Sequence, residues 1–351
     1  MSTQQIQRTL HNVGRRLQEQ SLADSSRRQY GKVWDQWLIW CRHFRYQPFL
    51  QDDYEPLYLF ALYAWHFGFN KQQKGNTYGT VRRKLNAIAW HHRANGYPIP
   101  QLSDAQRLAL LGMQKLSPAK RIRKPVTPAL LRAIYARLDF STPSNQLLWG
   151  GILLGFFFLL RRSNICGKNG KQHLYQIRGD DIVFESHEGK TWEKAAIPDR
   201  VKLRIRGEKN HTRDGPQFRT MCQSGDDALC PVKGAMWAKS GARKLGLQER
   251  QPLLGFRYPK GVEAKELSMA IKTGAEALGL DKDHYTIHSL RAGGATALFG
   301  MGYDGLAVKT LGRWLSDAYM VYTTVSPVVT QTMSAAMARF QDEITEGPPQ
   351  V

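Results

Sequence analysis

Residues 288–298 read HSLRAGGATAL. In a helix, His288 and Arg291 are three residues apart and project from the same face. The residues that follow, Ala292 to Ala295, are too small to fill a core alone, so they allow another backbone to approach closely. A helix N-terminus also attracts phosphate groups. The stretch predicts a closely packed helix that presents an imidazole and a guanidinium to an anion, although a His-x-x-Arg pair is common by chance.

A second signal is LLRRSN at residues 159–164. It ends the longest apolar run of the chain, Leu147 to Leu160, which is too short to span a membrane and predicts a buried helix. We expect this helix to occupy residues 144–163. Buried helices rarely end in charge without a partner for it, so Arg161 and Arg162 are candidates for anion binding. Alternatively, they only complement the dipole at the helix end.

Two further signals flank the first. Residues 201–206 alternate apolar and basic side chains and predict a half-buried strand, with a return strand at 217–221. Lys209 lies in the turn between them, where a lysine is usually solvated. In LGRWLSDAYMVY, residues 311–322, Trp314 and Tyr322 are eight residues apart and can meet on one side of a helical stretch. Their alternative role is as two core aromatics.

The chain is strongly basic. It has 351 residues, 50 of them Lys or Arg and 29 Asp or Glu, with a formal net charge of +21. Residues 1–126 contain 20 basic and 7 acidic side chains, a net charge of +13. Such an excess indicates a polyanionic partner, most simply nucleic acid, against the alternative of a basic protein with no such ligand. The four cysteines form no CxxC pair, and the first residues contain no apolar segment, so we expect neither a disulfide framework nor a signal peptide.

The patterns predict a mainly α, α+β protein of two domains. The helical periodicity starts at residue 25, and no strand pattern interrupts the first domain. A basic, proline-rich segment, SPAKRIRKPVTP, then has the composition of a linker. The predicted parts are a polar, loosely held N-terminus (1–20), a helical domain (21–116), the linker (117–128), a mixed α/β domain with a small antiparallel sheet (129–345) and a tail (346–351).

Taken in order, the four signals resemble the tyrosine recombinase (phage-integrase-like) family. That family has an arginine after a long apolar helix, a lysine on a β-hairpin, a His-x-x-Arg pair, a histidine or tryptophan, and a nucleophilic tyrosine. The helical first domain, which corresponds to the family's core-binding domain, extends the resemblance over nearly the whole chain. The strings LLRRSN and GRW look most like the eukaryotic mobile-element branch, Crypton and DIRS-type elements.

The resemblance implies a DNA strand transferase that needs neither metal nor ATP, with the catalytic residues Arg161, Lys209, His288, Arg291, Trp314 and Tyr322. Tyrosine attack on the scissile phosphate would form a 3′-phosphotyrosine. The arginines would stabilise the added negative charge, and Lys209 would protonate the leaving 5′-oxygen. His288 would take or share the tyrosine proton, while Trp314 can only donate a hydrogen bond and pack. No cofactor is implied, because the phosphotyrosine conserves the bond for religation.

The sequence departs from the family pattern in three places. Asn164 lies where many members have Glu or Asp. CGKNGKQHL, residues 166–174, looks like an insertion. The Trp314–Tyr322 interval is one residue shorter than in many members, so Tyr319 remains an alternative nucleophile.

The implied partner is double-stranded DNA, bound by a dimer on one site and a homotetramer on two, with no role for a membrane. The basic residues predicted to touch DNA are Arg27, Arg28, Arg82, Arg83, Lys84, Lys120, Arg121, Arg123 and Lys124. KRIRK in the linker has the composition of a nuclear localisation signal, so we expect a eukaryotic protein to be nuclear and a bacterial one to lie with the nucleoid. Two rival functions are a type IB topoisomerase or telomere resolvase, and a domesticated DNA-binding protein without catalysis.

Overall fold

The computed structural model describes residues 2–68, 70, 74–119, 122–167, 172–186, 188, 190, 197–207, 215–254 and 262–322, with only the backbone for 321 and 322. The chain divides into two compact units, Met1–Lys120 and Arg121–Val351. Lys120, Arg121, Lys209, the side chain of Tyr322 and the predicted tail lie outside the described residues.

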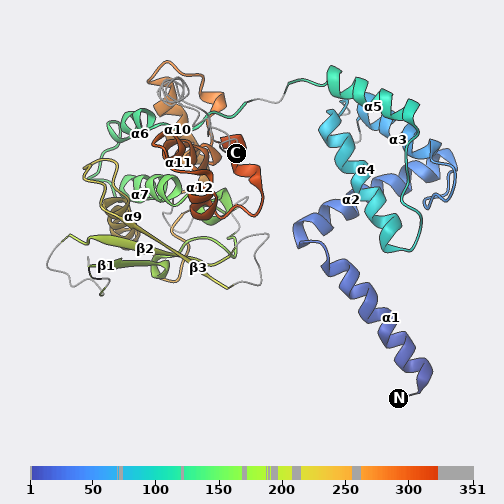
Figure 1. Cartoon of the computed structure of the whole chain (residues 1–351), viewed down its shortest axis with the longest axis horizontal. Coiled ribbons are helices and arrows are strands. Elements are labelled where there is room, and N and C mark those ends of the chain that lie inside the picture. The colour runs from blue at the N-terminus through green and yellow to red at the C-terminus, as the bar shows by residue number, and fades with distance from the viewer. Residues whose placement is uncertain are drawn as a thin grey trace, which may run out of the picture. The chain divides into compact units, whose positions relative to one another are not determined.

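Every regular element in the described residues of the first unit is a helix. Aromatic side chains form much of its core, where Trp37, Trp40 and Phe60 are at most 3% exposed. Trp37 stacks on Trp40, and Phe60 packs edge-on against both rings. The helices are α1 (Thr3–Gln20), α2 (Asp24–Phe44), α3 (Glu55–His66), α4 (Tyr78–Ala94) and α5 (Asp104–Leu116) (Figure 1).

The segment predicted to be a polar, loosely held N-terminus contains an 18-residue helix, α1. Ser2 and Gln5 form a reciprocal capping box at its start, which satisfies N–H groups that would otherwise lack partners. None of its residues is buried, and its apolar side chains share one face at helical spacing: Ile6, Leu10, Val13 and Leu17. The polar composition concealed this periodicity.

The second unit combines helices with a small sheet, so the mainly α, α+β prediction is confirmed. Its elements are α6 (Pro128–Tyr135), α7 (Pro143–Phe157), α8 (Arg162–Ile165), η1 (Gly179–Asp181), β1 (Ile182–Glu185), β2 (Arg200–Ile205), β3 (Gln217–Cys222), α9 (Pro231–Lys244), α10 (Ala264–Glu276), η2 (Lys282–His284), α11 (His288–Gly300), α12 (Gly305–Gly312) and η3 (Asp317–Tyr322). α7 is buried from Gln146 to Phe156 and forms the centre of the unit.

The three strands pair antiparallel in the order β1-β2-β3. Along β2, the apolar residues Val201, Leu203 and Ile205 are buried and alternate with half-exposed basic ones, as predicted for this strand. α9 packs on β2 and β3 and also lies against α7 (Figure 1). A Cβ at Gly150 would lie 2.4 Å from the Gly234 carbonyl oxygen, which shows how closely α7 and α9 approach.

Two predicted boundaries differ from the structure. α7 ends at Phe157, six residues before the expected end at 163, because the chain turns through Leu159 with a φ of +48°. The second half of the predicted linker is bonded to the second unit: the Lys124 N–H donates to the His284 carbonyl and the Val126 N–H to the Ser289 carbonyl, each at 3.0 Å. These residues are therefore part of the second unit's packing.

Candidate active site

Arg161 lies at the end of the turn that follows α7. Its φ and ψ of −71° and 152° are extended, and it is the N-cap residue of the short helix α8. The sequence predicted that Arg161 ends the long apolar helix, but in the structure it lies outside that helix. Its half-buried guanidinium donates from Nη2 to the Arg313 carbonyl at 3.4 Å. Its own N–H donates to Oδ1 of Asn164 at 3.1 Å.

Arg291 lies one turn into α11 and is only 1% exposed. Its Nη1 donates to the Leu159 carbonyl at 2.7 Å and its Nη2 to the Gly312 carbonyl at 2.6 Å. The guanidinium carbon also lies 4.0 Å from the centre of a Trp314 ring, a cation–π contact. Arg291 thus connects the turn before Arg161 with the end of α12.

The small residues of α11 make this approach possible. A Cβ at Gly293 would lie 2.0 Å from the Val126 carbonyl oxygen, and one at Gly294 would lie 2.2 Å from that of Phe156. Backbone atoms cannot yield at such distances, so both positions require glycine. The close packing predicted for HSLRAGGATAL is present in the structure.

His288 is the first residue of α11 and is half-buried. Burial lowers the pKa of its imidazole, and the positive charges of Arg123, Arg291 and Arg161 lower it further. This imidazole is therefore neutral at pH 7 and can accept a proton. The structure places Arg161, His288, Arg291 and Trp314 around one site, where guanidinium groups can bind an oxyanion and an imidazole can move a proton.

The two candidate tyrosines have different surroundings. The half-buried ring of Tyr319 lies 6.2 Å from that of Trp314 and packs on a small apolar cluster that includes Leu159 and Val308. A Cβ at Gly305 would lie 2.5 Å from its hydroxyl. Tyr319 is thus a packed aromatic, whereas Tyr322 ends η3 with a side chain outside the described residues.

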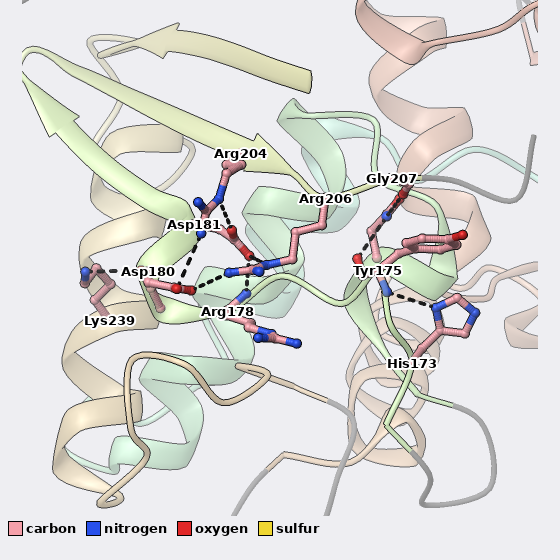
Figure 2. A network of polar contacts seen from close by, with 11 residues as sticks. His173, Tyr175, Arg178, Asp180, Asp181, Arg204, Arg206, Gly207 and Lys239 are labelled. Carbon is pink, nitrogen blue, oxygen red and sulfur yellow. Dashed lines mark hydrogen bonds and ion pairs between the residues drawn. The ribbon is translucent and has the colours of Figure 1, made fainter. Parts of the chain in front are cut away.

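Lys209 lies outside the described residues, but the strands on either side of its turn are described. β2 and β3 pair up to Ile205 opposite Gln217. At this end of β2, the carboxylate of Asp181, which has no exposed surface, accepts from Nε of Arg204 at 2.7 Å and Nε of Arg206 at 2.8 Å (Figure 2). Asp180 pairs with the same two arginines, so the base of the turn is held by a network of ion pairs (Figure 2).

The side chain of Asn164 connects the base of the β2–β3 turn to Arg161. The side chain has no exposed surface. Its Nδ2 donates to the carbonyls of Tyr175 at 3.2 Å and Gly207 at 3.4 Å, while its Oδ1 accepts from the Arg161 N–H. An amide can donate and accept in this way, whereas a carboxylate at the same place cannot donate.

The predicted DNA-binding residues differ in exposure. Arg28, Arg82, Arg83, Arg123 and Lys124 are exposed, and Arg27 is half-exposed beside Asp24. Lys84 contradicts the prediction, because it is 6% exposed and its ammonium bonds to the Gln36 side chain. Its position on α4 faces α2 rather than solvent, and burial lowers its pKa. Lys120 and Arg121 lie outside the described residues.

No protein-family model matches this chain, and no curated protein matches it. Solved structures do match. The XerH site-specific recombinase, in a post-cleavage complex with a palindromic difH substrate, has a TM-score of 0.50 at 13% identity, with 82% of this chain and 72% of that chain covered. The second unit has the tyrosine-recombinase fold. XerA recombinase (TM-score 0.40, 12% identity, 92% and 94% covered) and the Tn1549 transposon integrase (0.45, 13%, 82% and 85%) are further similar structures.

The sequence did not single out one arginine of this recombinase fold. Arg313 precedes Trp314 and is 5% exposed, with its guanidinium bonded to the turn after α7. Burial, together with the charge of Arg219, lowers its pKa to about 9. The string GRW shows that a basic residue precedes Trp314. The sequence does not show that the Arg313 side chain points inward, because this depends on a left-handed backbone with a φ of +58°.

The described residues contain no group of three or more His, Cys, Asp or Glu side chains that could hold a metal ion. No helix within them has both the length and the apolar character needed to cross a membrane.

Proposed function

We propose that this protein is a DNA recombinase that cuts and rejoins DNA strands through a 3′-phosphotyrosine intermediate. One observation carries the proposal: an imidazole and two guanidinium groups, from His288, Arg161 and Arg291, converge within a tyrosine-recombinase fold. The likeness to the XerH site-specific recombinase, whose structure is a post-cleavage complex with a palindromic difH substrate, supports DNA as the partner. The net charge of +21 fits the same ligand.

In this proposal the Tyr322 oxygen attacks the scissile phosphorus and its proton passes to His288. The bond from phosphorus to the 5′-oxygen breaks, and Lys209 supplies the proton that this oxygen needs. Arg161 and Arg291 bind the nonbridging oxygens, whose negative charge increases in the transition state. The reverse reaction, with a 5′-hydroxyl from another strand, rejoins the DNA and releases the tyrosine.

The finer parts of the proposal rest on sequence strings. LLRRSN and GRW favour a mobile element of the Crypton or DIRS type, for which the reaction would be integration or transposition. Joining two DNA sites would then involve four protomers, a dimer on each site. KRIRK in the linker favours a nuclear location for a eukaryotic protein.

Covalent trapping tests the proposal without knowledge of the target. The full chain is incubated with nicked duplexes that carry a randomised segment, and labelled protein–DNA adducts are separated on a denaturing gel and sequenced. The nick lets the short cleaved strand diffuse away, so the adduct accumulates. We expect an adduct with wild-type protein and with Tyr319→Phe, and none with Tyr322→Phe.

The alternatives give different results. A catalytically silent DNA-binding protein binds the duplexes but forms no adduct, which would refute the proposed function. An adduct that persists in Tyr322→Phe and disappears in Tyr319→Phe would overturn the assignment of the nucleophile. On substrates that carry the recovered sequence, recombinant joints support a recombinase, whereas relaxed circles alone or hairpin ends support the rival enzymes.

A further inference from the structure

The C-terminus of α12 turns Arg313 into the interior. Arg313 is the C-cap residue of this helix and has a left-handed backbone, with φ and ψ of 58° and 47°. For a residue other than glycine this conformation is unfavourable, so the surroundings must maintain it. The result is a guanidinium that is 5% exposed, placed beside the turn that leads to Arg161.

The planar guanidinium of Arg313 bridges two successive carbonyls of that turn. Nη1 donates to the Phe158 oxygen at 3.1 Å and Nη2 to the Leu159 oxygen at 3.3 Å. In return, the Arg313 carbonyl accepts from Nη2 of Arg161 at 3.4 Å. The side chain of Arg313 thus holds the backbone before Arg161, and its main chain holds the guanidinium of Arg161.

The turn that Arg313 holds is itself strained. Leu159 has a φ of +48°, an unfavourable value for a branched residue. Its carbonyl accepts from Arg291 at 2.7 Å as well as from Arg313, so two guanidinium groups fix the orientation of this peptide. Main-chain carbonyls satisfy N–H donors without neutralising them, so these bonds keep positive charge at the site.

We propose that Arg313 is a positioning residue of the site, whose two-pronged bond to the Phe158 and Leu159 carbonyls sets the direction of Arg161 toward the phosphate. This inference rests on the proposed function. It assigns Arg313 to a task that needs the shape of a guanidinium and not only its charge. Lysine has the charge, but its single ammonium lacks the planar fork that matches two neighbouring acceptors.

Three variants of the full chain test this. Arg313→Lys keeps the charge and Arg313→Gln removes it, while Arg219→Lys is a matched control. Arg219 is a neighbouring arginine that donates to the Thr310 carbonyl of α12 at 3.0 Å and, within the described part of the chain, makes no hydrogen bond to the turn. Adduct formation is timed on one nicked duplex recovered by trapping, and amide hydrogen exchange is followed for the segment 158–166.

We expect both Arg313→Lys and Arg313→Gln to form the adduct about 10²-fold more slowly than the wild-type protein. This is the scale of the rate loss when a reacting group is misplaced by about 1 Å. Amide exchange in residues 158–166 should be faster in both variants, while exchange in strands β2 and β3 stays at the wild-type rate. The Arg219→Lys variant should match the wild-type protein in both exchange and adduct formation. Because Arg313 acts through Arg161, the double variant Arg161→Ala/Arg313→Lys should be no slower than Arg161→Ala. Independent damage to the fold would instead multiply the two effects.

Several outcomes overturn the inference. Wild-type rates with Arg313→Lys would mean that charge alone matters. Unchanged exchange in 158–166 would mean that Arg313 does not hold the turn, and faster exchange with normal cleavage would mean that the turn does not direct Arg161. If wild-type protein forms no adduct, the proposed function fails, but the exchange measurement still decides whether Arg313 holds the turn.

Discussion

Replacing Asn164 by aspartate tests whether the fold needs an amide, and not a carboxylate, at this position. Asn164→Asp preserves the shape of the side chain but removes its two donors. The carbonyls of Tyr175 and Gly207, now 3.2 and 3.4 Å from Nδ2, would then face an oxygen. The Arg161 N–H, which donates to Oδ1, keeps its acceptor.

The expected cost follows from the burial of this side chain, which has no exposed surface. A buried polar group that loses its partner costs about 1–3 kcal/mol, and an unpaired buried charge about 3–5 kcal/mol. We therefore expect a loss of about 3–5 kcal/mol in the unfolding free energy of the second unit at pH 8. For a unit of this size, that lowers the melting temperature by roughly 6–20 °C.

The penalty should depend on pH with a defined sign. Burial raises the folded-state pKa of the introduced carboxyl above its unfolded value of about 3.9. Below that value both states are protonated, and a protonated carboxyl can donate one bond again. As pH rises from about 4, only the unfolded state ionises, so the penalty grows by about 1.4 kcal/mol per pH unit until the folded-state pKa is reached.

Scanning calorimetry of the full chain between pH 4.5 and 8 measures this. Asn164→Ala should show a constant deficit relative to wild type, because it introduces no titrating group. Asn86→Asp, at an exposed position on α4, adds the same charge and should leave the melting temperature of the second unit unchanged. An Asn164→Asp variant that melts within about 2 °C of wild type at pH 8, or with a deficit independent of pH, would refute this account.

Three further predictions concern other parts of the molecule. The buried His92 accepts from the Leu50 N–H at 2.9 Å, and burial lowers its pKa. The first unit should therefore lose stability as pH falls below the unfolded value of about 6.5, and His92→Gln should flatten that slope in urea titrations at pH 5–7.5; parallel slopes would contradict this. Arg291→Lys should slow adduct formation by about 10²-fold or more, the scale for one preorganised donor, and near-normal cleavage would remove Arg291 from the site. Neutralising Arg123 and Lys124 with glutamine should reduce the slope of log K against log salt by about 1.8 if both contact phosphate, whereas an unchanged slope in DNA-binding titrations would exclude them.

Local patterns predicted the elements that carry the site. The alternation in 201–206 predicted β2 because a half-exposed strand buries every second side chain, and the structure buries Val201, Leu203 and Ile205. The glycines of HSLRAGGATAL predicted close packing because only a residue without a Cβ allows a backbone within about 2 Å of the Cβ position, as at Gly293. Both signals concern neighbours in the chain, which a sequence displays directly.

Two residues lie in surroundings that the sequence did not predict, because contacts with distant parts of the chain determine their positions. Lys84 is basic and directly follows the two exposed arginines Arg82 and Arg83, but its position on α4 faces α2, and its ammonium bonds to Gln36, 48 residues away. Arg161 appears in the sequence to end a long helix, yet the turn at Leu159 detaches it, because carbonyls there are bonded by Arg291 and Arg313 from more than 130 residues away. Neither contact leaves a trace in the local pattern.

The order of residue types along the chain was therefore enough to indicate a mainly helical protein and its small sheet, because periodicity and glycine placement act locally. The direction of each side chain at the candidate active site required the tertiary fold. Arg313 points inward because its left-handed backbone is maintained by bonds to Phe158 and Leu159, and Asn164 links Arg161 to Gly207 across 43 residues. Such bonds form only after distant segments have packed and excluded water, so their free energy belongs to the folded structure and not to any one stretch of sequence.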